Sequence, residues 1–218
     1  MLRDKTGASF IANPGDEISR TTPATTTGKV LRIGVAGVEG SFTEMAARMH
    51  CNVGGLNLFE LVYLTATDNV LVSLETGGID RAIFAIENSI GGVVREYLPA
   101  ILKHRCKFVT TFDFEVEQVL MVNPKVMGGQ VTVIISQGQA LAQCQIHLRE
   151  NYPDIPQRDY IDTATAARDL RGGKLPRTAA VVGSRAAARL YDLDVLAGPI
   201  QDNQKNYTTF IVAERLAE

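Results

Sequence analysis

The sequence predicts an α/β fold built from two lobes. Short β-branched runs alternate with segments of helical periodicity, as in βα units around a largely parallel sheet. The alternation stops once, at residues 107–122, where two apolar runs follow each other without a helix. Such a connection is a natural crossing between lobes, so we place the boundary near Phe112, with residues 30–112 in lobe 1 and 113–218 in lobe 2. The chain has 218 residues, 45% of them hydrophobic, which can bury a core as one large α/β domain or as two small lobes.

The predicted elements follow in order along the chain. Apolar β-branched runs predict strands and 3.6-residue periodicity predicts helices. The predicted strands are 30–37, 58–64, 81–86, 107–112, 115–122, 131–135 and 179–182, with a last one that includes the triplet Thr208-Thr209-Phe210. The predicted helices are 41–50, 68–78, 93–104, 138–148, 163–170 and 184–192.

Composition excludes several classes of partner. The 22 basic and 24 acidic residues nearly balance and form no basic patch, so we expect no nucleic-acid partner. No stretch reaches the roughly 18 to 20 apolar residues of a membrane span. Three widely spaced cysteines fit neither a zinc site nor a disulfide framework and suit a reducing compartment. Residues 1–29 show almost no periodic apolar pattern and no secretion signal, so we expect a flexible tail and a cytoplasmic protein.

Four predicted strands end in small or polar residues that would cap the next helix. Helix amino ends beyond the carboxyl ends of such strands offer N–H groups and a positive dipole, which suit anions. Between two facing lobes these ends can converge on one small carboxylate ligand, although each can equally be an ordinary N-cap. The four stretches are Ala36-Gly37 to Ser41, Ile86-Glu87-Asn88-Ser89, Ile135-Ser136-Gln137-Gly138 and Val182-Gly183-Ser184.

Four sequence blocks carry a family resemblance: GVEGSFTEMAA, AIFAIENSIGGVV, SQGQALAQC and YDLDVLAGPIQDNQKNYTTFIV. Together they resemble the prephenate dehydratase family over residues 31–214. The resemblance implies a two-lobed architecture like that of type II periplasmic binding proteins, with a ligand cleft between the lobes. It implies a lyase of phenylalanine biosynthesis that converts the dicarboxylate prephenate to phenylpyruvate with loss of CO2 and water. Neither a metal nor an organic cofactor is expected, and a homodimer is possible.

The resemblance also implies roles for individual residues. The family assigns proton donation to the Thr of a Thr-Arg-Phe triplet, which maps onto Thr208. A threonine hydroxyl is a weak acid, so it would act through a short hydrogen bond in a site shielded from water. Glu87 would anchor its turn, because a carboxylate beside a dianionic substrate is repulsive. The residues expected to bind substrate are Ser41, Phe42, Thr43, Asn88, Ser89, Ser136, Gln137, Gln139 and Arg95.

Three positions differ from the family pattern. Thr209 replaces the Arg of the triplet, Gln137-Gly138 stands where His-Pro is usual, and Gln118 stands where His is common. Arg binds a carboxylate bidentately in a way that Thr does not, and its uncompensated loss costs about 2 to 5 kcal/mol. The cations that could compensate are Arg95, our first choice, Lys205 and Arg185.

These differences leave alternatives open. A non-aromatising prephenate decarboxylase would release CO2 and keep the ring hydroxyl, and the loss of Arg and His could serve that change. A ligand-binding relative without catalysis would keep only the cleft. Arogenate, in which an amino group replaces the keto oxygen of prephenate, is a possible substrate. The sequence stops soon after the final strand, so we expect neither the ACT regulatory domain common in the family nor feedback by phenylalanine through it.

Overall fold

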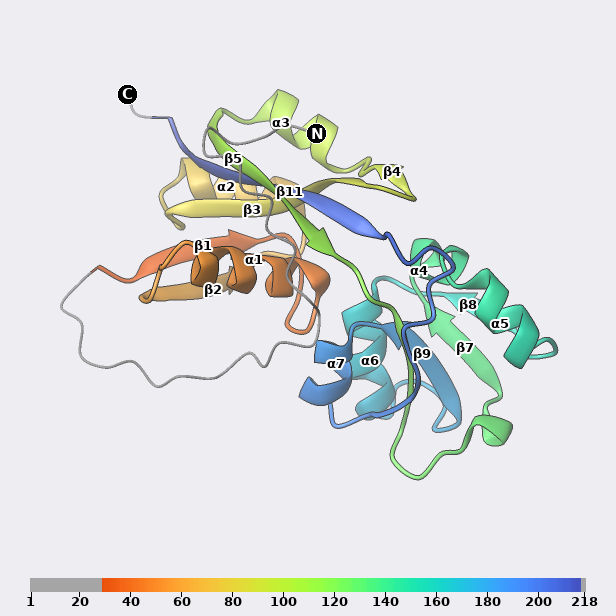
Figure 1. Ribbon diagram of the computed structural model, residues 1–218. Helices are drawn as coiled ribbons and strands as arrows, with labels where there is room; N and C mark the ends of the chain where they lie inside the picture. Colours follow the sequence, from red (N-terminus) through yellow and green to blue (C-terminus); the bar gives the residue numbers. More distant parts are fainter. Residues whose placement is uncertain (1–28, 217–218) are drawn as a thin grey trace.

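The computed structural model describes residues 29–216, which fold into two α/β lobes (Figure 1). The expected tail therefore lies almost entirely outside the described residues. The elements in lobe 1 are β1 (Leu31–Val35), α1 (Phe42–Val53), β2 (Phe59–Tyr63), α2 (Thr67–Glu75), β3 (Arg81–Asn88), β4 (Gly92–Val93), α3 (Tyr97–Lys103), β5 (Cys106–Glu115) and β11 (Tyr207–Arg215). Those in lobe 2 are β6 (Val119–Val122), η1 (Gly128–Gln130), β7 (Val133–Ser136), α4 (Gly138–Ala142), α5 (Gln145–Asn151), β8 (Gln157–Asp159), α6 (Thr163–Arg171), β9 (Ala179–Gly183), α7 (Arg185–Leu190) and β10 (Asp194–Ala197).

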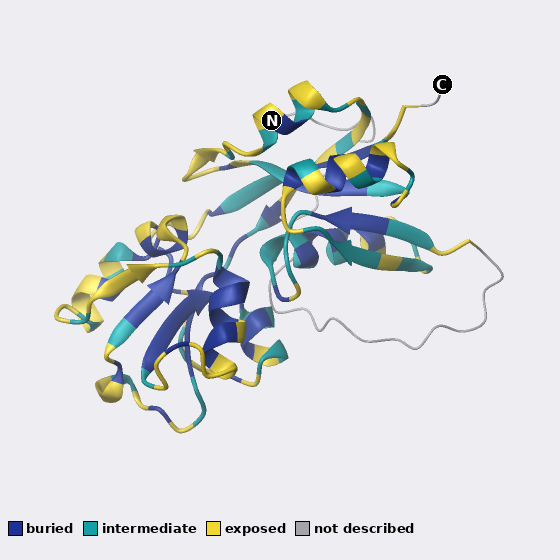
Figure 2. Cartoon of the chain, turned by 180° about the vertical axis from the view of Figure 1, so that it is seen from behind, coloured by how far each residue is buried: buried dark blue, intermediate teal, exposed yellow. Residues whose placement is uncertain are grey.

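Each lobe has one mixed sheet with helices on both faces. The first sheet has the order β2-β1-β3-β11-β5, with β4 paired to β3, and the second has the order β10-β6-β9-β7-β8. In lobe 1, α1 packs against one face and α2 and α3 against the other. In lobe 2, α6 and α7 cover one face and α4 and α5 the other. Buried residues accordingly concentrate in the strands and on the inner sides of the helices (Figure 2).

The last strand corrects the predicted division of the chain. Strand β11 pairs antiparallel with both β3 and β5, so it lies inside the first sheet although it follows all of lobe 2. The predicted boundary at Phe112 falls inside β5, which continues to Glu115. The chain crosses between the lobes twice, at 116–118 and at 198–206, and the N–H of Val116 donates to the carbonyl of Asn206 at 2.8 Å. The prediction missed this return because a strand's sequence does not identify its partner strands.

Two predicted helices also differ from the structure. The helix predicted over 93–104 begins at Tyr97, because Pro99 has no N–H and its ring blocks a helical turn before it. The residues just before pair instead as β4 with the end of β3. The helix predicted over 138–148 is broken into α4 and α5 at Gln143 and Cys144. None of the helices in residues 29–216 is long and apolar enough to cross a membrane.

Candidate functional site

Asn88, the last residue of β3, has a side chain whose orientation is fixed by the backbone. Its residue is only 5% exposed, and its Oδ1 accepts from the N–H groups of Ile90 at 3.1 Å and Gly91 at 2.8 Å. A backbone N–H can only donate, so Oδ1 must face this turn. The amide nitrogen therefore points the other way, toward the start of β11.

The Asn88 amide nitrogen reaches Thr208. Its Nδ2 lies 3.0 Å from Thr208 Oγ1, 2.8 Å from Asn206 Oδ1 and 3.1 Å from the Tyr207 carbonyl. An amide N–H donates and does not accept, so the Thr208 oxygen is the acceptor of this bond. Within residues 29–216, no acceptor is bonded to the Thr208 hydroxyl proton, and the residue is half-buried. The proton is thus available to a bound molecule.

Gln143 connects this group to lobe 2. Its Nε2 donates to Asn88 Oδ1 at 3.2 Å, and its Oε1 accepts from Asn206 Nδ2 at 3.1 Å. Asn88, Asn206 and Gln143 therefore form a closed ring of three hydrogen bonds, which we call the amide ring. Gln118 extends it, because its Nε2 donates to Gln143 Oε1 at 3.3 Å. All four residues are at most 6% exposed, and none is ionisable.

The first predicted cap stretch lies where lobe 1 contacts lobe 2. Ser41 caps α1, since its Oγ accepts from the Glu44 N–H at 3.3 Å. Just before it, Gly40 and Glu39 supply carbonyls to Ser184 Oγ at 2.8 Å and Tyr191 OH at 2.9 Å, both from lobe 2. The α1 end and the amide ring thus both lie on the side of lobe 1 that faces lobe 2.

Phe42 and Thr43 are the first two residues of α1. The side chain of Phe42 packs against the core of lobe 1, so it does not offer a free polar contact. The backbone N–H groups of Phe42 and Thr43 make no hydrogen bond within the described part of the chain. They are the donors at this end that a carboxylate could use.

The polar groups of the two predicted cap stretches in lobe 2, after β7 and β9, mostly form hydrogen bonds within the protein. Ser136 is fully buried and donates to the Val182 carbonyl at 2.6 Å, so its predicted contact with substrate is wrong. The N–H of Gly138, at the start of α4, is bonded to the carboxylate of Asp159 at 2.6 Å. Ser184 caps α7 through the N–H of Ala187. Ordinary capping therefore accounts for these stretches of lobe 2.

Ser89, Gln137 and Gln139 are exposed and have different surroundings. The Ser89 hydroxyl donates to the Lys205 carbonyl at 3.2 Å and accepts from the Tyr207 N–H at 2.9 Å, so it holds the start of β11 against β3. The amide of Gln139 lies against Gly91, where a Cβ would collide with it. Gln137 precedes α4 without a capping hydrogen bond from its side chain. Gln139 is therefore a second contact between lobe 2 and the turn after Asn88.

Thr209 points away from Thr208. In the pairing of β11 with β5, Thr208 lies opposite Phe114 and Thr209 opposite Asp113, and successive side chains of a strand face opposite sides of the sheet. Thr209 Oγ1 donates to Asp113 Oδ1 at 2.6 Å. A longer side chain at 209 would meet Asp113 first. The expectation that Thr209 replaces a cation needed beside Thr208 therefore has no support in this geometry.

The three candidate cations differ in their surroundings. Arg185 pairs with Glu117 at 2.9 Å. Arg95 and Lys205 are exposed, and their side chains make no ion pair within residues 29–216. Arg95 follows β4, whose Val93 pairs with Glu87 beside Asn88. Arg95 and Lys205 are thus both unpaired in the described part of the chain, and Arg95 is the one of the two that carries a guanidinium and follows the strand paired beside Asn88.

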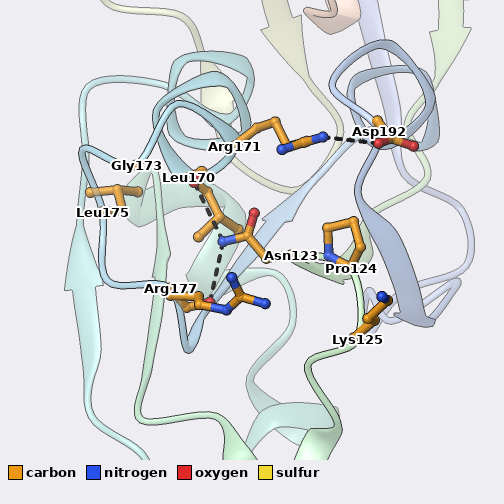
Figure 3. Close-up of a pocket in the computed structure, with 9 residues that line it drawn as sticks. All are labelled: Asn123, Pro124, Lys125, Leu170, Arg171, Gly173, Leu175, Arg177 and Asp192. Carbon is orange, nitrogen blue, oxygen red and sulfur yellow. Dashed lines mark hydrogen bonds and ion pairs between the residues drawn. The ribbon is translucent and has the colours of Figure 1, made fainter.

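Two prominent cavities lie elsewhere, in lobe 2. The larger, of about 530 Å³, is at the carboxyl end of α6 (Figure 3). There Arg171 pairs with Asp192 at 3.0 Å, and Asn123 donates to the carbonyls of Leu170 and Arg177. Basic residues at this position stabilise a helix carboxyl end, which explains them without a ligand. The other residues that line it are Pro124, Lys125, Gly173 and Leu175.

The smaller cavity, of about 220 Å³, lies beside α5 and the connection to β11, and contains His147 and Asp202. His50 stacks on Phe112, and His104 lies between Asp68 and Glu75. None of the three histidines takes part in the hydrogen bonds of the amide ring. The described residues hold no cluster of His, Cys, Asp and Glu that would bind a metal.

The fold and the amide ring define a two-lobed α/β protein of the type II periplasmic-binding-protein-like class, with its candidate site where the lobes meet. The chain belongs to the prephenate dehydratase family, whose sequence profile matches residues 33–217. It is 33% identical over 201 residues to arogenate dehydratase 1 of Petunia hybrida and 34% identical over 199 residues to the chloroplastic arogenate dehydratase 5 of Arabidopsis thaliana. Each match covers 91% of this chain and 45% of the relative, so the chain spans about half the length of these proteins.

A solved structure gives the same assignment. The prephenate dehydratase of Arthrobacter aurescens in complex with L-Phe superposes with a TM-score of 0.78 at 27% identity. The match covers 86% of this chain and 61% of that one. The resemblance seen in the four sequence blocks is thereby confirmed for the family and the fold.

Proposed function

We propose that this protein is a lyase that acts on prephenate or arogenate, and that it removes CO2 and water to form an aromatic ring. The observation that carries the proposal is the bond from Asn88 Nδ2 to Thr208 Oγ1 at 3.0 Å. Because Thr208 accepts from Asn88, its own proton is free to donate to the departing hydroxyl of the substrate. The family membership and the names of the relatives support the choice of substrate.

The reaction needs little from the protein beyond position and one donor. The bond to the ring carboxylate breaks, and its electron pair becomes a ring π bond while the carbon–oxygen bond to the hydroxyl breaks. The hydroxyl takes the Thr208 proton and leaves as water, and Thr208 regains a proton from solvent. Aromatisation supplies most of the driving force, so a preorganised hydrogen bond at the departing oxygen is the contribution we assign to the protein.

Substrate carboxylates must be held without neutralising the one that leaves. We assign one of them to the backbone N–H groups of Phe42 and Thr43 and one to Arg95. The α1 end supports the first assignment, because its N–H groups lack partners within residues 29–216 and carry the positive end of the helix dipole. The unpaired guanidinium of Arg95 supports the second. Glu87, Ser89 and Ser136 keep structural roles in this assignment.

Product analysis tests the proposal. The protein is incubated separately with prephenate and with arogenate, and products are followed by mass and ultraviolet absorbance. Phenylpyruvate or phenylalanine is the expected product. A non-aromatic hydroxylated keto acid from prephenate would instead identify a decarboxylase, and two unchanged substrates would identify a ligand-binding relative.

A further inference from the structure

Asn206 is fully buried at the end of the second crossing, directly before β11. Its Oδ1 accepts from Asn88 Nδ2 at 2.8 Å, and its Nδ2 donates to Gln143 Oε1 at 3.1 Å. It therefore contacts one residue from each lobe with the two ends of a single amide. Its side chain does not bond to Thr208 in the described structure, so any influence on that residue passes through Asn88.

The direction of the amide ring is fixed. The backbone N–H groups of Ile90 and Gly91 hold Asn88 Oδ1, which requires Gln143 to present Nε2 to it. Gln143 must then present Oε1 to Asn206, which requires Asn206 to present Nδ2 to Gln143 and Oδ1 to Asn88. Turning any one of the three amides would place oxygen against oxygen and nitrogen against nitrogen. A buried polar group without a partner costs free energy of folding, so the orientation of each amide depends on the orientations of the other two.

The hydrogen count on Asn88 links this ring to Thr208. Asn88 Nδ2 has two hydrogens and three acceptors, namely Asn206 Oδ1, the Tyr207 carbonyl and Thr208 Oγ1. If Asn206 takes one hydrogen, the other is shared between Tyr207 and Thr208. The turn N–H groups fix which way the Asn88 amide faces, and the ring bonds at its two ends restrain how its second hydrogen is divided between Tyr207 and Thr208.

We propose that Asn206 is a positioning residue that, together with Gln143, makes the donor geometry of Thr208 depend on contact between the two lobes. The inference rests on the proposed function, because it takes Thr208 as the proton donor. Gln143 belongs to lobe 2, whereas Asn88 and Thr208 belong to lobe 1. Separation of the lobes would break the bond from Gln143 to Asn88 and open the ring. The closed ring, which restrains the Asn88 amide from lobe 2 in addition to the turn of lobe 1, therefore exists only when the lobes are together.

The substitution Asn206→Asp tests this directly. The new carboxylate keeps the acceptor toward Asn88 but places a second oxygen against Gln143 Oε1, so the ionised form opens the ring. Burial without a cation raises the pKa of a carboxyl group, and its protonated form donates to Gln143 and restores the ring. We expect kcat to fall about 100-fold at pH 8, as for a small misplacement of a catalytic group. It should recover as the pH is lowered to 5, with KM little changed.

Two controls accompany this variant. Asn203→Asp adds the same charge three residues earlier, at an exposed side chain whose Oδ1 accepts the Lys205 N–H, and should keep the wild-type profile. Asn206→Ala should lose kcat equally at every pH. Wild-type activity for Asn206→Asp at pH 8, or a loss that does not recover in acid, would overturn the inference. If Asn206→Asp does not fold, Gln143→Glu poses the same test, because its new oxygen faces Asn88 Oδ1 and must be protonated to close the ring.

A second measurement separates this inference from the proposed function. If the wild type turns over neither substrate, the proposed function is contradicted. The persistence of the amide ring can still be tested without activity, by measuring the hydrogen exchange of its side-chain amides by NMR. Compared with the wild type at the same pH, the Asn88 and Gln143 amide hydrogens of Asn206→Asp should exchange faster at pH 8 and at a similar rate at pH 5. Fast exchange in the wild type would show that the ring does not persist, which overturns the inference.

Discussion

Asn88 donates its amide N–H to the hydroxyl oxygen of Thr208 across 3.0 Å, and the turn after β3 prevents the reverse orientation. This relationship decides which partner of the bond keeps a free proton. A threonine whose oxygen already accepts one hydrogen bond is also a slightly better donor in the other direction, because hydrogen bonds in a chain polarise one another.

Removing the Thr208 hydroxyl should abolish most of the activity. Thr208→Val keeps the shape of the side chain and removes the proton, so kcat should fall about 10²- to 10⁴-fold, as expected for the loss of a positioned acid. Thr208→Ser should keep a substantial part of kcat, because its hydroxyl can occupy the same place. Initial rates at saturating substrate give the comparison, and full activity in Thr208→Val would refute the assignment.

Restoring the family triplet should change little. Thr209→Arg places a guanidinium beside Asp113 on the opposite side of the sheet from Thr208. The new pair would be exposed and worth about 0 to 1 kcal/mol of stability. Because the new side chain would lie on the side of the sheet away from Thr208, we expect KM and kcat close to those of the wild type. A tenfold fall in KM would show instead that position 209 does reach the substrate.

Arg95 should affect binding more than chemistry. If it holds a substrate carboxylate equally in the ground and transition states, Arg95→Ala should raise KM about tenfold and leave kcat nearly unchanged. Arg149→Ala, at another exposed arginine without an ion pair in the described structure, serves as the matched control. An unchanged KM for Arg95→Ala, with a raised KM for Lys205→Ala, would move the role to Lys205.

His104 predicts a pH dependence of stability outside the site. Its Nδ1 lies 2.8 Å from Glu75 and its Nε2 3.1 Å from Asp68, and the hydrogen bond with Glu75, followed by that with Asp68, raises the pKa of His104 against the effect of burial. A raised folded-state pKa means that the charged form stabilises the fold. This contribution is fully present below the unfolded value near 6.5 and is lost as the pH rises through the higher folded pKa.

The measurement is the free energy of unfolding by denaturant between pH 5.5 and 8.5. The wild type should lose stability across this range relative to His104→Gln, which cannot ionise. The carboxyl groups of Asp68 and Glu75 have lowered pKa values and stay ionised throughout the range, so they do not contribute to the change. Parallel curves for wild type and variant would contradict the prediction.

The order of strands and helices could largely be predicted from the sequence, whereas their partners could not. Apolar runs such as 131–135 and 179–182 became β7 and β9, because buried strands of a parallel pair are hydrophobic on both faces. Strand β8 was missed because its three residues, Gln157–Asp159, are all exposed and polar. Strand β10 was missed for a similar reason, since its first two residues are exposed.

Some residues of the candidate site could likewise be predicted from the sequence, and others could not. Asn88 and Thr208 were expected together because both lie on family motifs, and the structure brings them into contact. Asn206 and Gln143 lie in the same family blocks, but nothing in the sequence singled them out from their neighbours, because a buried amide side chain and an exposed one are written with the same letter. Ser136 was misassigned for the opposite reason, because a serine at a strand end reads as a ligand contact even when a neighbouring carbonyl uses its hydroxyl. Hydrogen-bond partners across lobes follow only from the fold.

The insertion of β11 between β3 and β5 also sets the order in which the protein can be completed during synthesis. A ribosome releases residues 29–115 long before residues 207–215, yet β3 and β5 have no pairing with each other in the first sheet. Lobe 2, whose strands are all contiguous in the chain, is free to fold first, contrary to the usual amino-to-carboxyl order. Until β11 is made, the edges of β3 and β5 that it will cover have no partner strand, and an unpaired strand edge can template aggregation.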